Sequence, residues 1–304
     1  MYFIIAVVTL FCVLLFNLFC SAPLQTAFGV WGIAATEVGY ALIALAGASA
    51  MIVGARKTET DGVDCLEIFS TRAPSPKSVC GGLLLIGASY FSAALLSNIL
   101  YMLFPGLVDR TVDSMKNAFY AANLPTMLVT MALFPAICEE LVFRGVLQYA
   151  VDRHGTPRIA VLLTGVVFGL FHLDPVRIPI AAMTGIALCY ALYRSKSIFV
   201  PMLMHFANNA ASALVSAMPA ASNEAAVEES AAALAQLGLP ENLIYLFAGA
   251  ELTVMVLGLL IGGLALLEPK PMESLKKHKA TAIVLACIVL ALGAGYSILA
   301  MFTA

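Results

Sequence analysis

Apolar residues run along this chain in long stretches, which short polar segments interrupt at intervals. A helix that crosses about 30 Å of hydrocarbon needs about 20 mostly apolar residues, because its backbone must satisfy its own hydrogen bonds there. By that measure the pattern predicts eight or nine transmembrane helices, and the fifth segment is the shortest. The predicted spans are 2–20, 31–54, 80–104, 125–151, 157–173, 178–194, 197–217, 243–267 and 280–302.

The expected fold class is therefore all-α, a polytopic membrane helical bundle. Hydrophobic residues make up 62% of the chain and charged residues 11%, a balance that a soluble monomer could not bury. No polar block is long enough to fold separately, so residues 1–304 are expected to form a single integral membrane domain. The first twenty residues lack the positively charged start of a signal peptide, which favours a retained first membrane helix.

The segments between the spans contain residues that predict where helices begin and end. Thr156 followed by Pro157 has the form of an N-cap with proline at the first helical position. Asp174 followed by Pro175 should end the segment before it. The stretch 107–121 mixes charged and apolar residues, as an interfacial helix does.

Basic residues predict the orientation, because cytoplasmic loops carry them in excess. With the N-terminus in the cytoplasm, the basic residues concentrate in the inside loops at 55–79, 152–156, 194–197 and 268–279, and the acidic loop 218–242 lies outside. If the host is a prokaryote, this predicts an inner (cell) membrane protein. The formal net charge of −2 excludes the basic surplus of a nucleic-acid-binding protein, so no nucleic acid partner is expected.

Three charged residues lie within the predicted span 125–151, namely Glu139, Glu140 and Arg144. Left unpaired and facing lipid, they would cost on the order of 8–10 kcal/mol, so they must face a protein interior. Glu140 and Arg144 are four apart and can pair on one helix face, whereas Glu139 points about 100° away. A purely structural ion pair would therefore leave Glu139 unexplained. Pro135, four residues before Glu139, should free a backbone carbonyl and distort the helix.

Two histidines lie in other predicted spans, His172 and His205, while His154 and His278 fall in loops. A single histidine in a helix usually only makes a hydrogen bond. Asn209, however, follows His205 by four residues, so both side chains project from one helix face as a polar pair. These two histidines and the amide are therefore candidate site residues.

Three short motifs now stand in separate spans, and together they resemble those of the CAAX protease and bacteriocin-processing (Abi) family of intramembrane proteases, relatives of the Ras-converting prenyl endopeptidase. Each motif alone is weak, but their order within about 70 residues is specific. The family core would occupy about 125–217. The motifs are E-E-x-x-x-R at Glu139, Glu140 and Arg144, F-x-x-x-H at Phe168 and His172, and H-x-x-x-N at His205 and Asn209.

The resemblance implies an intramembrane endopeptidase in which Glu139 and His172 activate the attacking water. It implies that His205 and Asn209 form the oxyanion hole. It also implies a membrane-associated polypeptide substrate cut near its C-terminus, which would be a prenylated CAAX-type protein if the host makes such proteins. The residues expected to support the site are Glu140, Arg144 and Phe168.

Other interpretations remain open. A zinc-dependent version of the protease would use Glu139, His172 and His205 as ligands. An H-E-x-x-H helix is absent, so a glutamate-type mechanism without a metal cofactor is preferred. Ionisable residues inside spans also mark transporters, although no internal repeat is visible, and a non-proteolytic immunity-type adaptor could share the scaffold. The sequence leaves the oligomeric state and the choice of substrate open.

Overall fold

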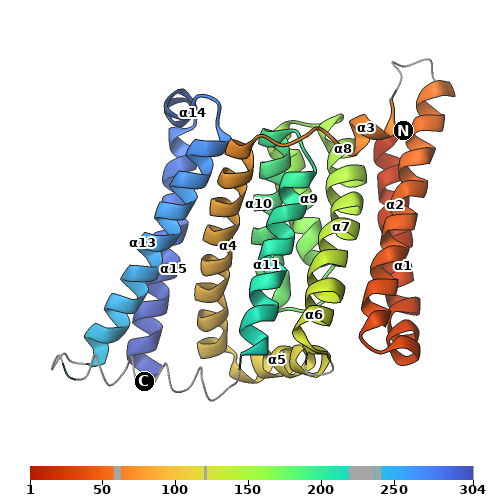
Figure 1. The fold of residues 1–304 in the computed structure, drawn as a ribbon. Helices are drawn as coiled ribbons and strands as arrows, with labels where there is room; N and C mark the ends of the chain where they lie inside the picture. The colour runs from red at the N-terminus through yellow and green to blue at the C-terminus, as the bar shows by residue number, and fades with distance from the viewer. Residues whose placement is uncertain (58–62, 120–121, 219–235, 237–240, 304) are drawn as a thin grey trace.

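The computed structural model describes residues 1–57, 63–119, 122–218, 236 and 241–303. All nine predicted spans are helical, and the described residues contain no strand beyond a single bridge between Thr71 and Ser197. The protein is thus an all-α, multi-pass membrane bundle (Figure 1). Its long helices are α1 (Tyr2–Phe28), α2 (Trp31–Lys57), α4 (Pro76–Leu103), α9 (Pro157–Leu170), α10 (Arg177–Ser195), α11 (Phe199–Ala217), α13 (Glu241–Leu267) and α15 (Lys279–Thr303).

Among the described residues, seven helical segments are long and apolar enough to cross a membrane. The two other predicted spans, α9 and α11, fall short for different reasons. Helix α9 has 14 residues, and α11 carries a histidine and two asparagines in its interior. The N-terminus and the end of α15 lie at opposite ends of the bundle (Figure 1).

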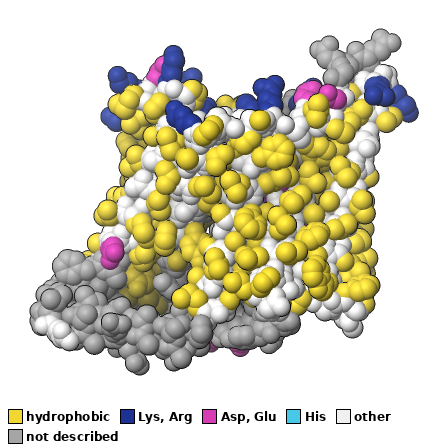
Figure 2. All heavy atoms as spheres, viewed as in Figure 1, with side chains coloured by type: hydrophobic (Ala, Val, Ile, Leu, Met, Phe, Trp, Pro, Cys, Tyr) yellow, Lys and Arg dark blue, Asp and Glu magenta, His cyan; other side chains and the backbone are white. Residues whose placement is uncertain are grey.

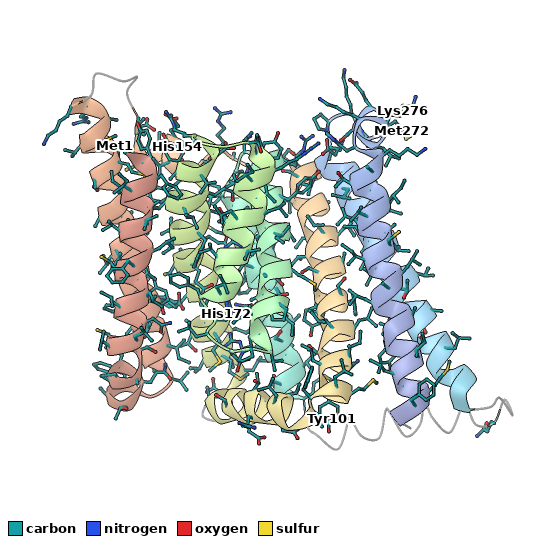
Figure 3. The ribbon with its side chains drawn as sticks, turned by 180° about the vertical axis from the view of Figure 1, so that it is seen from behind. Met1, Tyr101, His154, His172, Met272 and Lys276 are labelled. Atoms are coloured by element: carbon teal, nitrogen blue, oxygen red, sulfur yellow. The ribbon has the colours of Figure 1, made fainter. Side chains whose placement is uncertain are left out.

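The shortness of α9 places His172 within the depth of the bundle. Thr156 caps the helix by accepting a hydrogen bond from the backbone of Ile159, as the Thr-Pro pair predicts. At 1.5 Å per residue, α9 spans only about 21 Å before it ends at Leu170. The predicted boundary at 173 was three residues too late, so His172 lies on the turn after the helix (Figure 3).

The span Leu124–Asp152 alternates between α-helix and π-helix. Pro135 lies in the first turn of α7, directly after the first π-helical segment, where the sequence predicts a distortion. Such π-segments are rare and frequently lie at functional sites, because each one rotates the side chains that follow it. The span Leu124–Asp152 consists of α6 (Leu124–Met127), η1 (Leu128–Leu133), α7 (Phe134–Glu140), η2 (Leu141–Leu147) and α8 (Gln148–Asp152).

Two helical groups flank the centre of the bundle (Figure 1). On one side, α1 and α2 form a hairpin that packs against α7, η2 and α8. On the other side, α13 and α15 pack against α4. Between these two groups, α9 and α10 approach each other closely at Gly165. A side chain there would clash, since a Cβ on Gly165 would lie 2.6 Å from the backbone nitrogen of Ile186. Small residues allow this contact in membrane bundles.

Helix α5 (Pro105–Phe119) lies across the ends of the central helices rather than along them (Figures 1 and 3). It covers most of the stretch in which the sequence predicts an interfacial helix. Charged residues alternate with apolar residues along it, as on a helix at a membrane surface. The short helices α3 (Cys65–Ile68) and α14 (Pro271–Lys277) lie at the opposite end of the bundle (Figure 1).

Lysine and arginine side chains gather at the end of the bundle where α3 and α14 lie (Figure 2). We expect this end to face the cytoplasm, because cytoplasmic loops are basic. In a background without accessible cysteines, an impermeant thiol reagent should label Met272→Cys and Ser114→Cys from opposite sides of the membrane. Labelling of both from one side would contradict the expected orientation. The predicted outside loop 218–242 falls largely outside the described residues.

Candidate active site

Two adjacent carboxylates stand at the end of α7 and face different sides. Glu140 points into the packed interior, where its side chain is fully buried. The side chain of Glu139 keeps 18% of its surface exposed and lines a cavity. The 100° rotation between successive helical residues separates their environments, as the sequence predicts.

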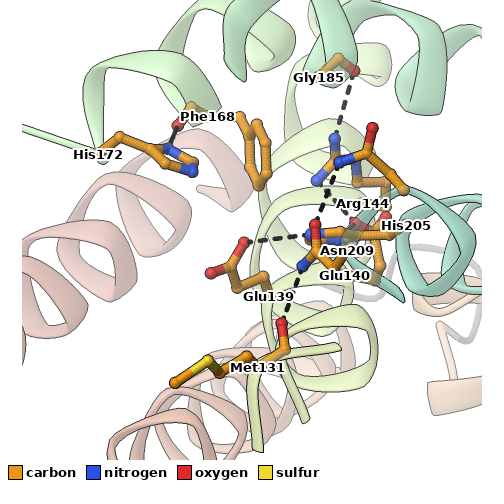
Figure 4. A network of polar contacts seen from close by, with 10 residues as sticks. Met131, Glu139, Glu140, Arg144, Phe168, His172, Gly185, His205 and Asn209 are labelled. Atoms are coloured by element: carbon orange, nitrogen blue, oxygen red, sulfur yellow. Dashed lines mark hydrogen bonds and ion pairs between the residues drawn. The ribbon is translucent and has the colours of Figure 1, made fainter. Parts of the chain in front are cut away.

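Glu140 is held by two cationic or hydrogen-donating groups. Its Oε1 atom lies 3.0 Å from Nη1 of Arg144, one helical turn away, and both side chains are fully buried. The same oxygen accepts a hydrogen bond of 2.8 Å from Nδ1 of His205 on α11 (Figure 4). Since a carboxylate can only accept, Nδ1 of His205 carries the hydrogen. Glu140 therefore ties η2 to α11.

Arg144 extends this network to α9 and α10. Its Nη2 atom donates a hydrogen bond of 3.3 Å to the backbone carbonyl of Gly185. The guanidinium carbon lies 4.4 Å from the ring centroid of Phe168, which is close enough for a cation–π interaction. One buried arginine of the first motif thus contacts Phe168 of the second motif on α9 and the backbone of α10.

His172 is oriented by the helix that precedes it. Its Nδ1 atom donates a hydrogen bond of 3.1 Å to the carbonyl of Phe168, so in the neutral ring Nε2 is a free acceptor. The ring also packs edge-on against Phe168, with 5.2 Å between centroids. In Figure 4, Glu139 lies between His172 on one side and His205 on the other.

His205 and Asn209 project from one face of α11 towards η1 and α7. The Nε2 atom of His205 lies 3.9 Å from Oε2 of Glu139. The amide of Asn209 donates a hydrogen bond of 3.2 Å to the carbonyl of Met131 in η1 and accepts one from Asn208. One of its two N–H groups is thus engaged by η1, and the second remains available to a ligand.

The carboxyl of Glu139 and the ring of His172 share one cavity of about 160 Å³. Phenylalanines form part of its wall, and polar side chains from five different segments reach it. The residues lining the cavity are Asn17, Glu37, Tyr40, Glu139, Phe143, Phe168, Phe171, His172 and Arg177.

The comparison with protein families bears on this arrangement. Residues 121–211 match the model of the family described as type II CAAX prenyl endopeptidase Rce1-like, and this segment contains all three motifs. The resemblance to the CAAX protease family is therefore confirmed. In Bacillus subtilis (strain 168), the protein named "Putative membrane peptidase YdiL" is 24% identical over 119 residues. That alignment covers 39% of this chain and 48% of the relative, so the chain spans about half of the relative's length. No solved structure matches the chain.

The cavity also contains polar residues that the three CAAX protease motifs did not indicate. Asn17, Glu37 and Tyr40 come from the hairpin of α1 and α2, outside the matched segment. Arg177 comes from the first turn of α10. Glu37 could have been found, because the rule that flags Glu139, a charge inside a predicted span, applies to it equally.

The alternative zinc set does not match the geometry of the site. Within the part of the chain that the structure describes, no three His, Cys, Asp or Glu side chains are close enough to hold one metal ion. Nδ1 of His205 is occupied by Glu140, and Glu139 remains 3.9 Å from the other ring nitrogen. Glu139, His172 and His205 would have to move closer together to bind zinc, so the described geometry does not form this zinc set.

The turn that carries His172 is fixed by Asp174. One oxygen of Asp174 accepts two backbone N–H groups at the start of α10, and the other accepts the hydroxyl of Thr111 at 2.8 Å. Partial burial raises the pKa of Asp174, but the hydrogen bonds from the Arg177 amide and Thr111 outweigh it, so the pKa lies below its usual range. Leu173, between His172 and Asp174 in the sequence, has a left-handed φ of 53°. This is a strained conformation that surrounding contacts must maintain.

Thr111 therefore connects the interfacial helix α5 to the position of His172. Replacing it with valine removes a hydrogen bond to a charged group, so the turn should open more often by about tenfold. We expect Thr111→Val to raise the rate at which diethyl pyrocarbonate modifies His172, measured by mass spectrometry. His154 and His278 provide internal controls, and Thr111→Ser should restore the original rate. An unchanged rate at His172 would show that α5 does not hold the turn.

Proposed function

We propose that this protein is an intramembrane endopeptidase that hydrolyses a peptide bond in a membrane-associated polypeptide. The observation that carries the proposal is the position of Glu139, a carboxylate from a membrane-spanning segment that reaches a cavity beside His172 and lies 3.9 Å from His205. The match to the CAAX prenyl endopeptidase family supports the same reaction class.

Glu139 is the proposed general base. A water molecule in the cavity donates one hydrogen bond to the Glu139 carboxylate, which takes the proton as the oxygen attacks the substrate carbonyl. His172 lines the same cavity, and its free Nε2 accepts a hydrogen bond from the departing amine. A positioned base of this kind typically contributes about 10²–10⁴-fold to the rate.

His205 and Asn209 are the proposed oxyanion donors. The Nδ1–H of His205 is occupied by Glu140, so its Nε2 must also carry a hydrogen to donate to the oxyanion. The second N–H of Asn209 adds another donor. Such preorganised donors are worth most where water is excluded.

The proposed steps conserve atoms and charge. The water oxygen forms a bond to the carbonyl carbon while its proton passes to Glu139. The tetrahedral intermediate then collapses, the C–N bond breaks, and the nitrogen takes the proton from Glu139. The products are a carboxylic acid end and an amine end, and the enzyme returns to its starting state.

The family description makes a prenylated C-terminal CAAX peptide the first substrate class to test. Cells that express the protein should be compared with cells that express Glu139→Gln, using mass spectrometry of peptides from the membrane fraction. We expect specific cleavage products near the C-termini of membrane-associated proteins in the wild-type sample only. Identical peptide sets from well-expressed proteins would contradict the proposed protease function.

A further inference from the structure

Glu37 is a buried carboxyl group in the interior of α2 that the three motifs do not include. Only 6% of its surface is exposed, and its Oε2 atom has no hydrogen-bond partner among the described residues. Helix α2 is one of the seven segments that can cross a membrane. A carboxyl group inside such a helix is costly and usually serves a function, so an unpartnered one calls for a reason.

The structural reason found for Glu140 does not apply to Glu37. Glu140 is buried against Arg144 and His205, which both contact its Oε1 atom. Within the described part of the chain, no lysine, arginine or histidine forms an ion pair with Glu37, although Arg177 lines the same cavity. No ion pair therefore explains why a carboxyl group is buried at position 37.

Glu37 instead shares a cavity with Glu139. Helix α2 packs against α7, and both carboxyl groups line the same space of about 160 Å³. Asn17 and Tyr40 bring further polar atoms from the same hairpin. A polar cavity of this size holds several water molecules, since one needs only about 10–15 Å³ of probe volume and two to four polar partners.

We propose that Glu37 orients the attacking water together with Glu139. The water donates one O–H to Glu139, which removes that proton, and the second O–H needs an acceptor so that a lone pair faces the substrate carbonyl. The carboxyl group of Glu37, which lines the cavity, supplies this acceptor. Glu37 exchanges no proton in this step. The inference rests on the proposed protease function and adds a residue from outside the matched family segment.

Variants at this position separate an orienting role from a structural one. Glu37→Gln keeps an oxygen acceptor and should lose less than tenfold in kcat. Glu37→Leu fits the site without an acceptor and should lose at least about 100-fold in kcat, because misplacing a reacting group costs that much, with KM within threefold. Its melting temperature in detergent should stay equal or rise, because an unpartnered polar group has left a spanning helix. Only an orienting role predicts lower kcat with undiminished stability.

The assay uses a farnesylated peptide with a quenched fluorophore across its last four residues, or a peptide from the membrane comparison above. Glu251→Leu is the matched control, since Glu251 is an exposed carboxylate of α13 and lies outside this cavity, and it should keep wild-type kcat. Wild-type kcat in Glu37→Leu, or lower stability in both Glu37 variants, would overturn the proposed role. If wild-type cleavage equals that of Glu139→Gln, the protease function itself fails, whereas the melting comparison still reports whether Glu37 is unpartnered.

Discussion

Glu139→Gln is expected to lose at least about 10³-fold in kcat while it keeps a normal folded yield. Glutamine preserves the shape and hydrogen-bonding capacity of the side chain but cannot take the proton from water. The side chain faces a cavity, and the histidine nearest to it, His205, keeps its 2.8 Å contact with Glu140, so the substitution should leave the fold intact. The yield is measured by size-exclusion chromatography of the purified protein, and kcat on the farnesylated peptide.

A matched substitution, Glu251→Gln on α13, should leave both quantities unchanged. His172→Ala and His205→Ala should also lower kcat, because the proposed mechanism requires all three side chains. Retention of wild-type kcat by Glu139→Gln would exclude Glu139 as the base.

Chelation separates the glutamate mechanism from its zinc-dependent alternative. If Glu139 acts as the base without a metal, the purified wild-type enzyme should keep its activity after exhaustive chelation, and elemental analysis should find no stoichiometric metal. A zinc enzyme would lose turnover and recover it with added metal, and either histidine variant would lose bound zinc. One zinc per chain with activity that follows it would overturn the glutamate mechanism and leave the protease function standing.

Much of the fold could be predicted from hydrophobic patterning alone. The requirement for about 20 apolar residues per span acts locally, so each of the nine segments carries its own signal. The length of α9 was harder to predict. Its apolar residues continue through Phe171, but the turn at 171–176 depends on Asp174 capping α10 and accepting a hydrogen bond from Thr111, a contact 63 residues away.

Contacts in the candidate site also fall into two groups, those between residues close in sequence, which can be predicted, and those between distant residues, which cannot. Spacing of four residues predicts the pair of Glu140 and Arg144, because helix geometry alone brings them together. The bond between Glu140 and His205 joins residues 65 apart, and only the packed bundle shows it. The motifs do not indicate Glu37, because no second charged residue lies near it in its helix to form a motif. The π-helical segments around α7 likewise depend on packing, since no residue type specifies them.

Arg144→Ala is expected to destabilise the protein strongly. Removing one partner of a buried ion pair typically costs about 3–5 kcal/mol, because the remaining charge is stranded. Here Glu140 would stay fully buried, and the contacts of the guanidinium with Gly185 and the Phe168 ring would disappear as well. We therefore expect a lower folded yield and a lower melting temperature in detergent, together with lower activity.

A double variant distinguishes the stranded charge from lost packing. Glu140→Gln combined with Arg144→Met removes both charges at similar volume, so most of the stability should return. Activity should stay low, because His205 would lose the carboxylate that accepts its Nδ1–H and orients its ring for oxyanion binding. Arg110→Ala, at an exposed arginine of α5, is the control and should change stability by less than about 0.5 kcal/mol. Wild-type melting and full activity in Arg144→Ala would show that the pair serves neither the fold nor the site.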